Sequence, residues 1–329
     1  MKPSTWVVLA AAAVAVTTLP AAAEVGSTKD IPVRVELHAV KSLWLSDQQF
    51  LIGDPNGKEV TIGFELRIAQ GSGKRPTMIL MHGSGGIGAN VPFWVRHFNA
   101  MGINTVTIDG MTGRGLTGVG DKQTVLGRLN FILDIYRTME VIARHPRVDT
   151  GKVALMGFSR GGQAALYASL ARFHRQWNKS GIDLAAYIPF YPDCATTYQG
   201  DTETTGKPIR IFHGTPDNYN PVATCKSYVA RLKAAKRDIE LAEYPHAPHG
   251  FDNPIGASPA VPAKANQSVR DCTIQEGPGG QLINAETKAV FSYTDACVKL
   301  DPLVGADREA TEVALQEVTA FLSKVFSPN

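Results

Sequence analysis

Three residues that could together break an acyl bond occur along the chain in the order Ser159, Asp217, His249. A serine hydroxyl is a weak nucleophile, so it needs a base within hydrogen-bond reach, and that base needs an acid to orient it. The order serine, acid, histidine is the one found in hydrolases whose serine lies on a sharp strand-to-helix turn. The sequence therefore predicts Ser159 as the nucleophile, His249 as the general base and Asp217 as the orienting acid.

The surroundings of Ser159 fit such a turn. Residues 152–170 read KVALMGFSRGGQAALYASL, which is a short apolar run, then Gly157-Phe158-Ser159-Arg160-Gly161, then a helical pattern. Glycines on both sides of a serine are typical of a turn where neighbouring backbone leaves no room for side chains. A serine that merely caps the following helix is the alternative. The acid and the histidine downstream favour the nucleophile.

Two backbone N–H groups are expected to stabilise the oxyanion that forms when the serine attacks. One belongs to Arg160, directly after the nucleophile. The other belongs to Ser84, within His82-Gly83-Ser84-Gly85-Gly86. Glycines in such a stretch let the backbone approach a substrate closely. A turn without function is the alternative, but the position of the stretch after an apolar run favours the oxyanion role.

The elements that must position these residues alternate between strand and helix patterns. Residues 33–40 and 59–68 alternate apolar and polar side chains, as half-buried antiparallel strands do. Short apolar runs, typical of strands buried on both faces of a parallel sheet, occupy residues 77–81, 103–108, 153–156, 185–190, 209–212 and 239–244. Helical patterns occupy residues 91–101, 125–144, 163–173, 222–236 and 308–325. The sequence thus predicts an α/β fold whose mostly parallel central sheet has helices on both faces. The three candidate residues then meet at the carboxyl edge of this sheet.

Residues 1–23 differ from the rest of the chain. Lys2 precedes the apolar run Trp6 to Val16, and Ala21-Ala22-Ala23 offers small residues for cleavage. This pattern predicts a secretory signal peptide, since the run is too short to span a membrane comfortably as an anchor. We therefore expect an exported protein, periplasmic or secreted, whose residues 24–329 form one domain without membrane insertion. The 33 Lys and Arg and the 30 Asp and Glu form no long run of one sign, which argues against nucleic acid as a main partner.

All four cysteines lie after residue 190, and an even number in an exported protein predicts two disulfides. We expect Cys194 to pair with Cys225, because one follows a parallel strand and the other begins the helix after the next strand. Cys272 then pairs with Cys297. The spacings contain no C-x-x-C and no nearby pair of histidines, so no metal site is predicted.

Residues 252–305 interrupt the alternation of strands and helices. They are rich in Pro, Gly, Ser and Asn and contain the last two cysteines. Because the segment begins directly after the candidate base, we expect a disulfide-stapled insertion that forms one wall of the substrate entrance. A passive surface excursion is the alternative, since long insertions are tolerated thermodynamically.

The motifs together resemble those of the dienelactone hydrolase family of α/β-hydrolases. The resemblance rests on His82-Gly83 after a strand, the glycine-flanked Ser159, His213-Gly214 with Asp217, and His249-Gly250-Phe251. It covers about residues 75–251 and the final helix, and it implies the α/β-hydrolase fold. By matching position it assigns the acid to Asp217 rather than Asp193, and the base to His249 rather than His246. The namesake enzymes resemble this chain but carry a cysteine nucleophile, and Ser159 in its place favours ordinary carboxylic esters as substrates.

The expected function is a serine hydrolase that cleaves carboxylic ester bonds of a small-molecule substrate through an acyl-enzyme. A peptidase or amidase with the same triad is the first alternative, and a binding protein with a silent triad is the second. Residues 113–118 spell G-x-G-x-x-G, but the next helical pattern begins only near Thr124, so a dinucleotide site is not predicted. No cofactor is implied. Trp94, Tyr191 and Tyr219 are candidates for lining a substrate pocket, with packing against the scaffold as the alternative.

Overall fold

The computed structural model describes residue 1 and residues 28–327. Apart from Met1, the signal peptide expected over residues 1–23 lies outside the described part of the chain. No helix within the described ranges has the length and apolar character needed to cross a membrane.

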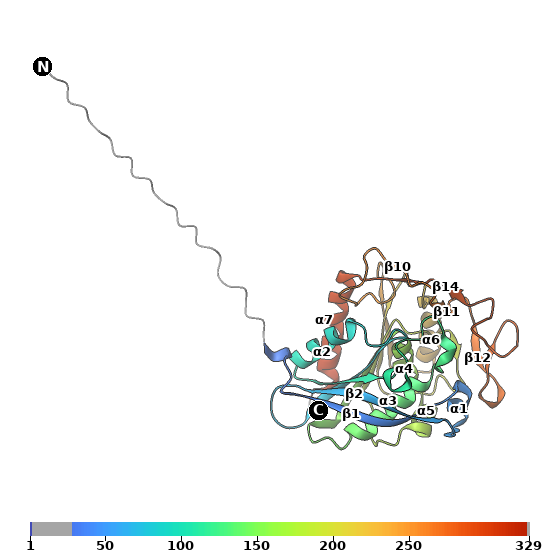
Figure 1. Cartoon of the computed structure of the whole chain (residues 1–329), viewed down its shortest axis with the longest axis horizontal. Helices are drawn as coiled ribbons and strands as arrows, with labels where there is room; N and C mark the ends of the chain where they lie inside the picture. The colour runs from blue at the N-terminus through green and yellow to red at the C-terminus, as the bar shows by residue number, and fades with distance from the viewer. Residues whose placement is uncertain (2–27, 328–329) are drawn as a thin grey trace.

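A sheet of eight strands forms the centre of the molecule, with the strand order β1-β2-β4-β3-β5-β6-β8-β9 (Figure 1). Strand β2 runs antiparallel to β1 and to β4, and the other neighbouring pairs run parallel. This confirms the predicted α/β fold with a mostly parallel sheet. Its strands are β1 (Arg34–Trp44), β2 (Lys58–Ile68), β3 (Arg75–Met81), β4 (Asn104–Asp109), β5 (Val148–Phe158), β6 (Ala186–Phe190), β8 (Ile209–Gly214) and β9 (Ile239–Tyr244).

Helices cover both faces of the sheet because successive residues of a strand point to opposite sides. In β3, Met78 and Leu80 pack with the helices α2 and α7, while Ile79 and Met81 pack with α3 and α4 on the other side. Helices α2 and α7 lie close together in Figure 1. The helices are α1 (Asp47–Ile52), α2 (Asn90–Ala100), α3 (Asn130–Ile142), α4 (Arg160–Tyr167), α5 (Ala171–Trp177), α6 (Val222–Ala234) and α7 (Arg308–Val325).

The single helix predicted over residues 163–173 is wrong, because the structure has two helices there. Helix α4 ends at Tyr167 and α5 begins at Ala171. Between them Leu170 is extended and forms an isolated antiparallel bridge with Thr204. The N–H of Ala171 donates to the carbonyl oxygen of Glu203 at 2.8 Å, so a distant segment replaces the helical hydrogen bonds at this point.

Residues 252–305 leave the sheet after β9, and their regular structure is limited to short strands and one short 3-10 helix, Pro278–Gly280. The strands are β10 (Val261–Pro262), β11 (Gln267–Ser268), β12 (Ile274–Glu276), β13 (Leu282–Asn284), β14 (Lys299–Leu300) and β15 (Leu303–Val304). Strand β12 pairs in parallel with β7 (Thr196–Thr197), which anchors this segment to the loop after β6. Both expected disulfides are confirmed: Cys194 is bonded to Cys225 and Cys272 to Cys297.

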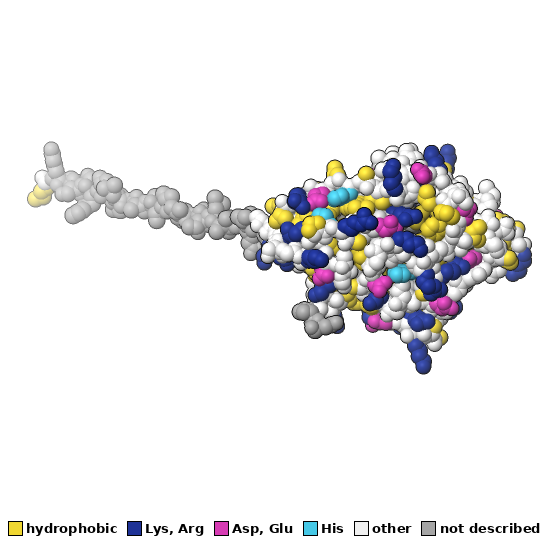
Figure 2. Space-filling view, turned by 90° about the horizontal axis from the view of Figure 1, so that it is seen from below, with side chains coloured by type: hydrophobic (Ala, Val, Ile, Leu, Met, Phe, Trp, Pro, Cys, Tyr) yellow, Lys and Arg dark blue, Asp and Glu magenta, His cyan; other side chains and the backbone are white. Residues whose placement is uncertain are grey.

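Charged side chains of both signs are interspersed on the molecular face shown in Figure 2. Lys and Arg side chains lie among Asp and Glu rather than in one continuous basic patch on that face.

Candidate active site

Ser159 occupies the turn between β5 and α4. Its backbone has φ 55° and ψ −115°, a conformation that side-chain-bearing residues rarely adopt. Such a strained turn persists only where the surrounding structure holds it, and such residues cluster at functional sites. The turn directs the serine away from the sheet, because the chain reverses direction sharply between a buried strand and a buried helix.

Three glycines make this turn possible by allowing backbone segments to touch. A Cβ atom on Gly157 would collide with the carbonyl oxygen of Gly161. A Cβ atom on Gly161 would collide with the carbonyl of Met81 in β3, and one on Gly162 with the carbonyl of Phe190 in β6. Because the colliding atoms belong to backbone, no side-chain rearrangement relieves the contact.

A continuous hydrogen-bonded chain joins the three residues that sequence analysis selected. His249 Nε2 lies 2.9 Å from Ser159 Oγ, and His249 Nδ1 lies 2.8 Å from Asp217 Oδ2. A carboxylate only accepts hydrogen bonds, so Nδ1 carries the proton and donates it to Asp217. Nε2 is then the unprotonated nitrogen and accepts from the serine hydroxyl. This arrangement is the one that general-base activation of Ser159 requires.

Asp217 is held in place from its other side. Its Oδ1 accepts hydrogen bonds from the backbone N–H groups of Tyr219 at 2.8 Å and Asn220 at 2.9 Å. The buried ring of His213 lies beside the same carboxylate, with Nδ1 4.0 Å from Oδ2. Burial lowers the pKa of His213, which keeps this second imidazole neutral and leaves the negative charge of Asp217 to His249.

Two tyrosines pack against the imidazole of His249. The ring centroid of Tyr219 lies 4.6 Å from that of His249, and the centroid of Tyr191 lies 4.8 Å away. The hydroxyl of Tyr191 donates to Asp252, a buried carboxylate. Trp94, by contrast, is a buried residue of α2 whose indole N–H also donates to Asp252, so its side chain packs within the scaffold.

The alternative acid and base lie outside this hydrogen-bonded chain. His246 is exposed on the loop after β9. Asp193 is buried and forms an ion pair with Arg128, with 2.6 Å between Oδ2 and Nη1. Asp193 Oδ1 accepts from the backbone N–H of Ala195 at 2.9 Å.

The loop after β3 approaches Ser159 closely. A Cβ atom on Gly83 would lie only 3.4 Å from the Cβ atom of Ser159. His82 fixes this loop: its Nε2 accepts from the N–H of Gly110 at 3.1 Å, so its Nδ1 carries the proton and donates to the carbonyl of Gly83 at 2.7 Å. Burial lowers the pKa of His82, which favours this neutral form.

The proposed oxyanion donors flank the nucleophile. Arg160 is the first residue of α4, and an N–H in the first turn of a helix has no acceptor within that helix. Ser84 directly follows Gly83, and its carbonyl accepts from the N–H of Val119 at 2.8 Å. The loop that carries Ser84 is therefore held on both sides of its N–H group.

A small cavity of about 20 Å³ adjoins Ser159. It is lined by loops from several parts of the chain and by residues 267–269 of the segment 252–305. The lining residues are Ser84, Gln123, Arg128, Ser159, Arg160, Gln163, Asp193, Tyr219, Asn220, Gln267, Ser268 and Val269. Gln123, Arg128 and Gln163 were not anticipated from the sequence, because no motif marks them.

The segment 252–305 is hydrogen-bonded to the loops that carry the acid and the base. Ser268 Oγ donates to the carbonyl of Tyr219 at 2.7 Å, and the N–H of Leu303 donates to Asn218 Oδ1 at 2.7 Å. The N–H of Gly305 donates to the carbonyl of His249 at 3.0 Å. The segment thus contacts both the loop that carries Asp217 and His249 itself.

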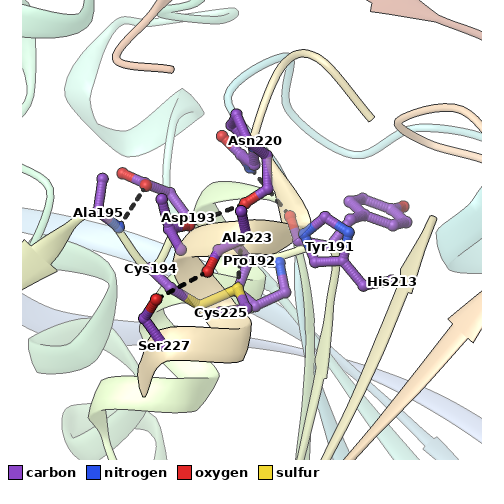
Figure 3. Close-up of a disulfide and its surroundings, with 12 residues drawn as sticks. Tyr191, Pro192, Asp193, Cys194, Ala195, His213, Asn220, Ala223, Cys225 and Ser227 are labelled. Atoms are coloured by element: carbon purple, nitrogen blue, oxygen red, sulfur yellow. Dashed lines mark hydrogen bonds between the residues drawn. A yellow bond between two sulfur atoms is a disulfide. The ribbon is translucent and has the colours of Figure 1, made fainter. Parts of the chain in front are cut away.

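Figure 3 shows the disulfide between Cys194 and Cys225, with Tyr191, His213 and Asn220 nearby. It joins the loop after β6 to the start of α6, and Figure 3 shows Asn220 directed at the backbone of Tyr191 nearby. Asn220 Nδ2 donates to that carbonyl at 2.9 Å. The hydrogen bond connects the loop after β6 to the loop that carries Asp217, and the disulfide connects the loop after β6 to the helix that follows Asp217.

Comparison with known proteins gives a match to one family over part of the chain, and a shared fold. A family model described as the dienelactone hydrolase family matches residues 121–274, which include Ser159, Asp217 and His249. No curated protein matches the sequence. The match confirms the resemblance inferred from the motifs.

Solved structures with the same fold share little sequence with this chain. A dienelactone hydrolase-like promiscuous phosphotriesterase from metagenomic libraries is 17% identical with a TM-score of 0.60, over 89% of this chain and 99% of that one. A putative dienelactone hydrolase from Klebsiella pneumoniae subsp. pneumoniae is 14% identical with a TM-score of 0.53, over 88% and 99%. Thermogutta terrifontis esterase 2, phosphorylated by paraoxon, is 16% identical with a TM-score of 0.53, over 88% and 96%.

Proposed function

We propose that this chain, which matches the dienelactone hydrolase family over residues 121–274, is an exported serine hydrolase that cleaves carboxylic esters through an acyl-enzyme. One observation carries the proposal: a single imidazole, His249, is hydrogen-bonded to Ser159 through Nε2 and to Asp217 through Nδ1. This geometry supports a triad in which Ser159 is the nucleophile, His249 the base and Asp217 the orienting acid.

In the first half of the reaction, Ser159 Oγ forms a bond to the carbonyl carbon of the ester while its proton moves to His249 Nε2. The carbonyl oxygen becomes an oxyanion, which accepts hydrogen bonds from the N–H groups of Ser84 and Arg160. When the oxyanion collapses, the carbon–oxygen bond to the alcohol breaks. His249 gives its proton to the departing alkoxide, and the acyl group stays on Ser159.

In the second half, water replaces the alcohol. His249 Nε2 takes a proton from the water as its oxygen attacks the acyl-enzyme, and the same two N–H groups stabilise the second oxyanion. Collapse breaks the bond between the acyl carbon and Ser159 Oγ, which takes the proton back from His249. The products are a carboxylic acid and an alcohol. Asp217 stays ionised and stabilises the imidazolium that forms in each half.

The domain organisation is part of the proposal. Residues 24–329 form a single hydrolase domain, residues 252–305 are an insertion within it, and residues 1–23 direct export. Two disulfides in the described part of the chain support an oxidising compartment.

Parallel assays with p-nitrophenyl acetate and with an aminoacyl p-nitroanilide test the proposal, because the triad alone does not distinguish an ester from an amide. We expect hydrolysis of the ester and little of the anilide. Treatment with phenylmethylsulfonyl fluoride followed by peptide mapping is expected to place the sulfonyl group on Ser159. Anilide hydrolysis that exceeds ester hydrolysis would favour a peptidase or amidase, and the absence of both activities would favour a binding protein.

A further inference from the structure

A cleft of about 540 Å³ opens between three separate parts of the chain. Its lining comes from residues 44–48 at the end of β1 and the start of α1, from residues 123–128, and from residues 281–293 of the segment 252–305. Gln48 Nε2 donates to the carbonyl of Gly279 at 3.0 Å, which joins α1 to that segment. Sites for small molecules commonly have volumes of about 300 to 1,000 Å³, so this cleft is large enough to hold one.

The cleft lies at the same edge of the sheet as Ser159. Trp44 ends β1 and pairs with Lys58, the first residue of β2. Because β2 runs antiparallel to β4, it begins at the edge where β4 and the parallel strands next to it end. Ser159 directly follows β5 at that edge.

One guanidinium group lies between the cleft and the cavity beside Ser159. Gln123 and Arg128 line both spaces. Arg128 Nη1 donates to Asp193 Oδ2 at 2.6 Å, and Asp193 lines the cavity. Arg128 Nε donates to the hydroxyl of Tyr293 at 2.5 Å, and Tyr293 lines the cleft. Since both acceptors bond to the same planar group, the two spaces are neighbours.

Aromatic and aliphatic side chains form much of the cleft wall. Trp44, Phe291 and Tyr293 supply three rings, and the ring centroids of the last two lie 5.3 Å apart in an edge-to-face arrangement. Val125 is 39% exposed and Val290 is 57% exposed, so apolar surface on this wall faces solvent. Aromatic walls favour a flat apolar ring, which can pack against them face to edge.

The charged residues of the lining are engaged within the protein. Arg128 is paired with Asp193. Asp47 Oδ1 accepts a hydrogen bond from the backbone N–H of Leu129 at 2.9 Å. We therefore expect the cleft to hold an uncharged group.

The size of the cavity beside Ser159 means that most of an ester must lie elsewhere. A volume of about 20 Å³ has room for roughly one water-sized group. In the proposed reaction the acyl group stays bonded to Ser159 through both halves, whereas the alcohol departs after the first. A cleft whose wall is exposed at Val125 and Val290 gives the alcohol a way out, so it suits the alcohol side.

We propose that this cleft is a subsite for an aromatic ring on the alcohol part of the ester, joined to the ester oxygen by a short chain. The inference rests on the proposed function, because it takes Ser159 as the nucleophile. The chain passes Arg128, and the ring packs among Trp44, Phe291 and Tyr293. The preferred substrates are then arylalkyl esters of short acids.

Acetates of phenylalkanols with two to five methylene groups test the subsite, each compared with the n-alkyl acetate that lacks the ring. The ratio of the two kcat/KM values, measured by acid release at constant pH, is expected to exceed one at the chain length that reaches the cleft. Val125→Glu places a charge on the wall and should lower this ratio by about two- to tenfold, the effect of losing aromatic contacts. Phe291→Leu removes one ring and should lower it as well. Val313→Glu is the matched control, since Val313 is also 39% exposed but lies on α7, and its ratio should equal that of the wild type.

Two outcomes would overturn the assignment while leaving the esterase intact. The first is a ratio that is the same in the wild type, Val125→Glu and Phe291→Leu, with the esters still hydrolysed. The second is that these two variants lower the preference for ethyl esters of phenylalkanoic acids over ethyl esters of n-alkanoic acids instead, which would place the acyl side in the cleft.

Failure of the proposed function is detected separately. A wild type that hydrolyses none of these esters would overturn the esterase and, with it, the assignment of the ring to a substrate alcohol. Calorimetric titration with 4-phenylbutan-1-ol measures the cleft without catalysis. Weaker binding by Val125→Glu than by the wild type and Val313→Glu would support a ring-binding site, and equal binding by all three would reject it.

Discussion

The hydroxyl of Tyr191 donates a hydrogen bond of 2.6 Å to Oδ1 of Asp252, and the ring of the same tyrosine lies against His249. The other carboxylate oxygen of Asp252 accepts from the indole N–H of Trp94 at 2.8 Å. Asp252 follows the motif His249-Gly250-Phe251 directly, so it ties the base loop to the helix α2. The buried carboxylate of Asp252 thus holds Tyr191, which packs on His249, and links it to Trp94 of α2.

Asp252→Asn is expected to change how stability depends on pH. Burial raises the pKa of Asp252, an effect that its hydrogen bonds with Tyr191 and Trp94 partly oppose. A raised pKa in the folded state means that the contribution of this group is fully present below the ordinary carboxyl pKa of about 4 and is lost as pH rises through the raised value. Asn does not titrate, so the variant should gain stability relative to the wild type between about pH 4 and pH 7. Thermal unfolding at both pH values measures this difference, and a difference that does not change with pH would contradict the prediction.

Ser159→Ala and His249→Ala are each expected to reduce kcat by about 10⁴- to 10⁶-fold while leaving the fold intact. The reason is that each removes one end of the hydrogen bond that, in the proposed mechanism, activates Ser159. His246→Ala is the matched control, because His246 is exposed on the same loop, and its kcat should stay near the wild-type value. Steady-state assays with p-nitrophenyl acetate measure all three, and a larger loss for His246→Ala than for His249→Ala would move the base to His246.

Val269→Ala is expected to let longer acyl groups into the site. Val269 is 2% exposed and lines the cavity beside Ser159, so truncation adds space next to the acyl group. The ratio of kcat/KM for p-nitrophenyl propionate over acetate should rise by roughly tenfold, about the discrimination that one methylene provides. Val261→Ala, at a 45% exposed position of the same insertion, should leave the ratio unchanged. Equal ratios in both variants would mean that the insertion does not limit acyl length.

Removal of the second disulfide is expected to weaken the folded state. The double substitution of Cys272 and Cys297 by Ser opens a bridge between residues 25 apart in sequence, and loop-closure entropy attributes about 3 to 4 kcal/mol to such a bridge. Urea unfolding of the variant and of the wild type gives the change in the free energy of unfolding. A change below about 1 kcal/mol would show that the insertion is held mainly by its other contacts.

Gly161→Ala is expected to prevent stable folding, because the new Cβ atom would meet the backbone carbonyls of Met81 and His82. The cost should exceed about 4 kcal/mol, in the range of severe overpacking against backbone. Gly151→Ala is the control, since its Cβ atom would meet nothing closer than 3.5 Å. Soluble yield and thermal melting distinguish the two. A well-folded Gly161→Ala protein would show that the turn at Ser159 can relax.

Much of the fold could be predicted from local patterns. The runs that became β3, β5 and β8 are mostly apolar because both faces of each strand are largely buried, and such a run can be recognised in the sequence alone. Asp217 and His249 follow the neighbouring parallel strands β8 and β9, so their meeting at one sheet edge follows from strand direction. The turn at Ser159 could be predicted from the glycines on both sides of this residue.

Other features depend on contacts between distant segments and left no local signal. The break at Leu170 arises from its bridge to Thr204, and a helical pattern in residues 163–173 does not reveal it. Arg128 receives its hydrogen-bond partner Tyr293 from 165 residues further along the chain. The buried amide nitrogen of Gln163 has no hydrogen-bond partner among the described residues, and this is visible only in the packed structure.

Hydrogen bonds to Tyr219, Asn218 and His249 come from the segment 252–305, the least regular part of the described chain. The positions of the proposed acid and base therefore depend on the stability of this segment. Segments with short strands and few buried apolar side chains open at lower free energy than the sheet beneath them. As temperature rises, we expect the loops that carry Asp217 and His249 to lose this support while the eight-stranded sheet is still intact. Heat inactivation should therefore precede melting, and residual activity after a warm pulse should report on the insertion rather than on the core.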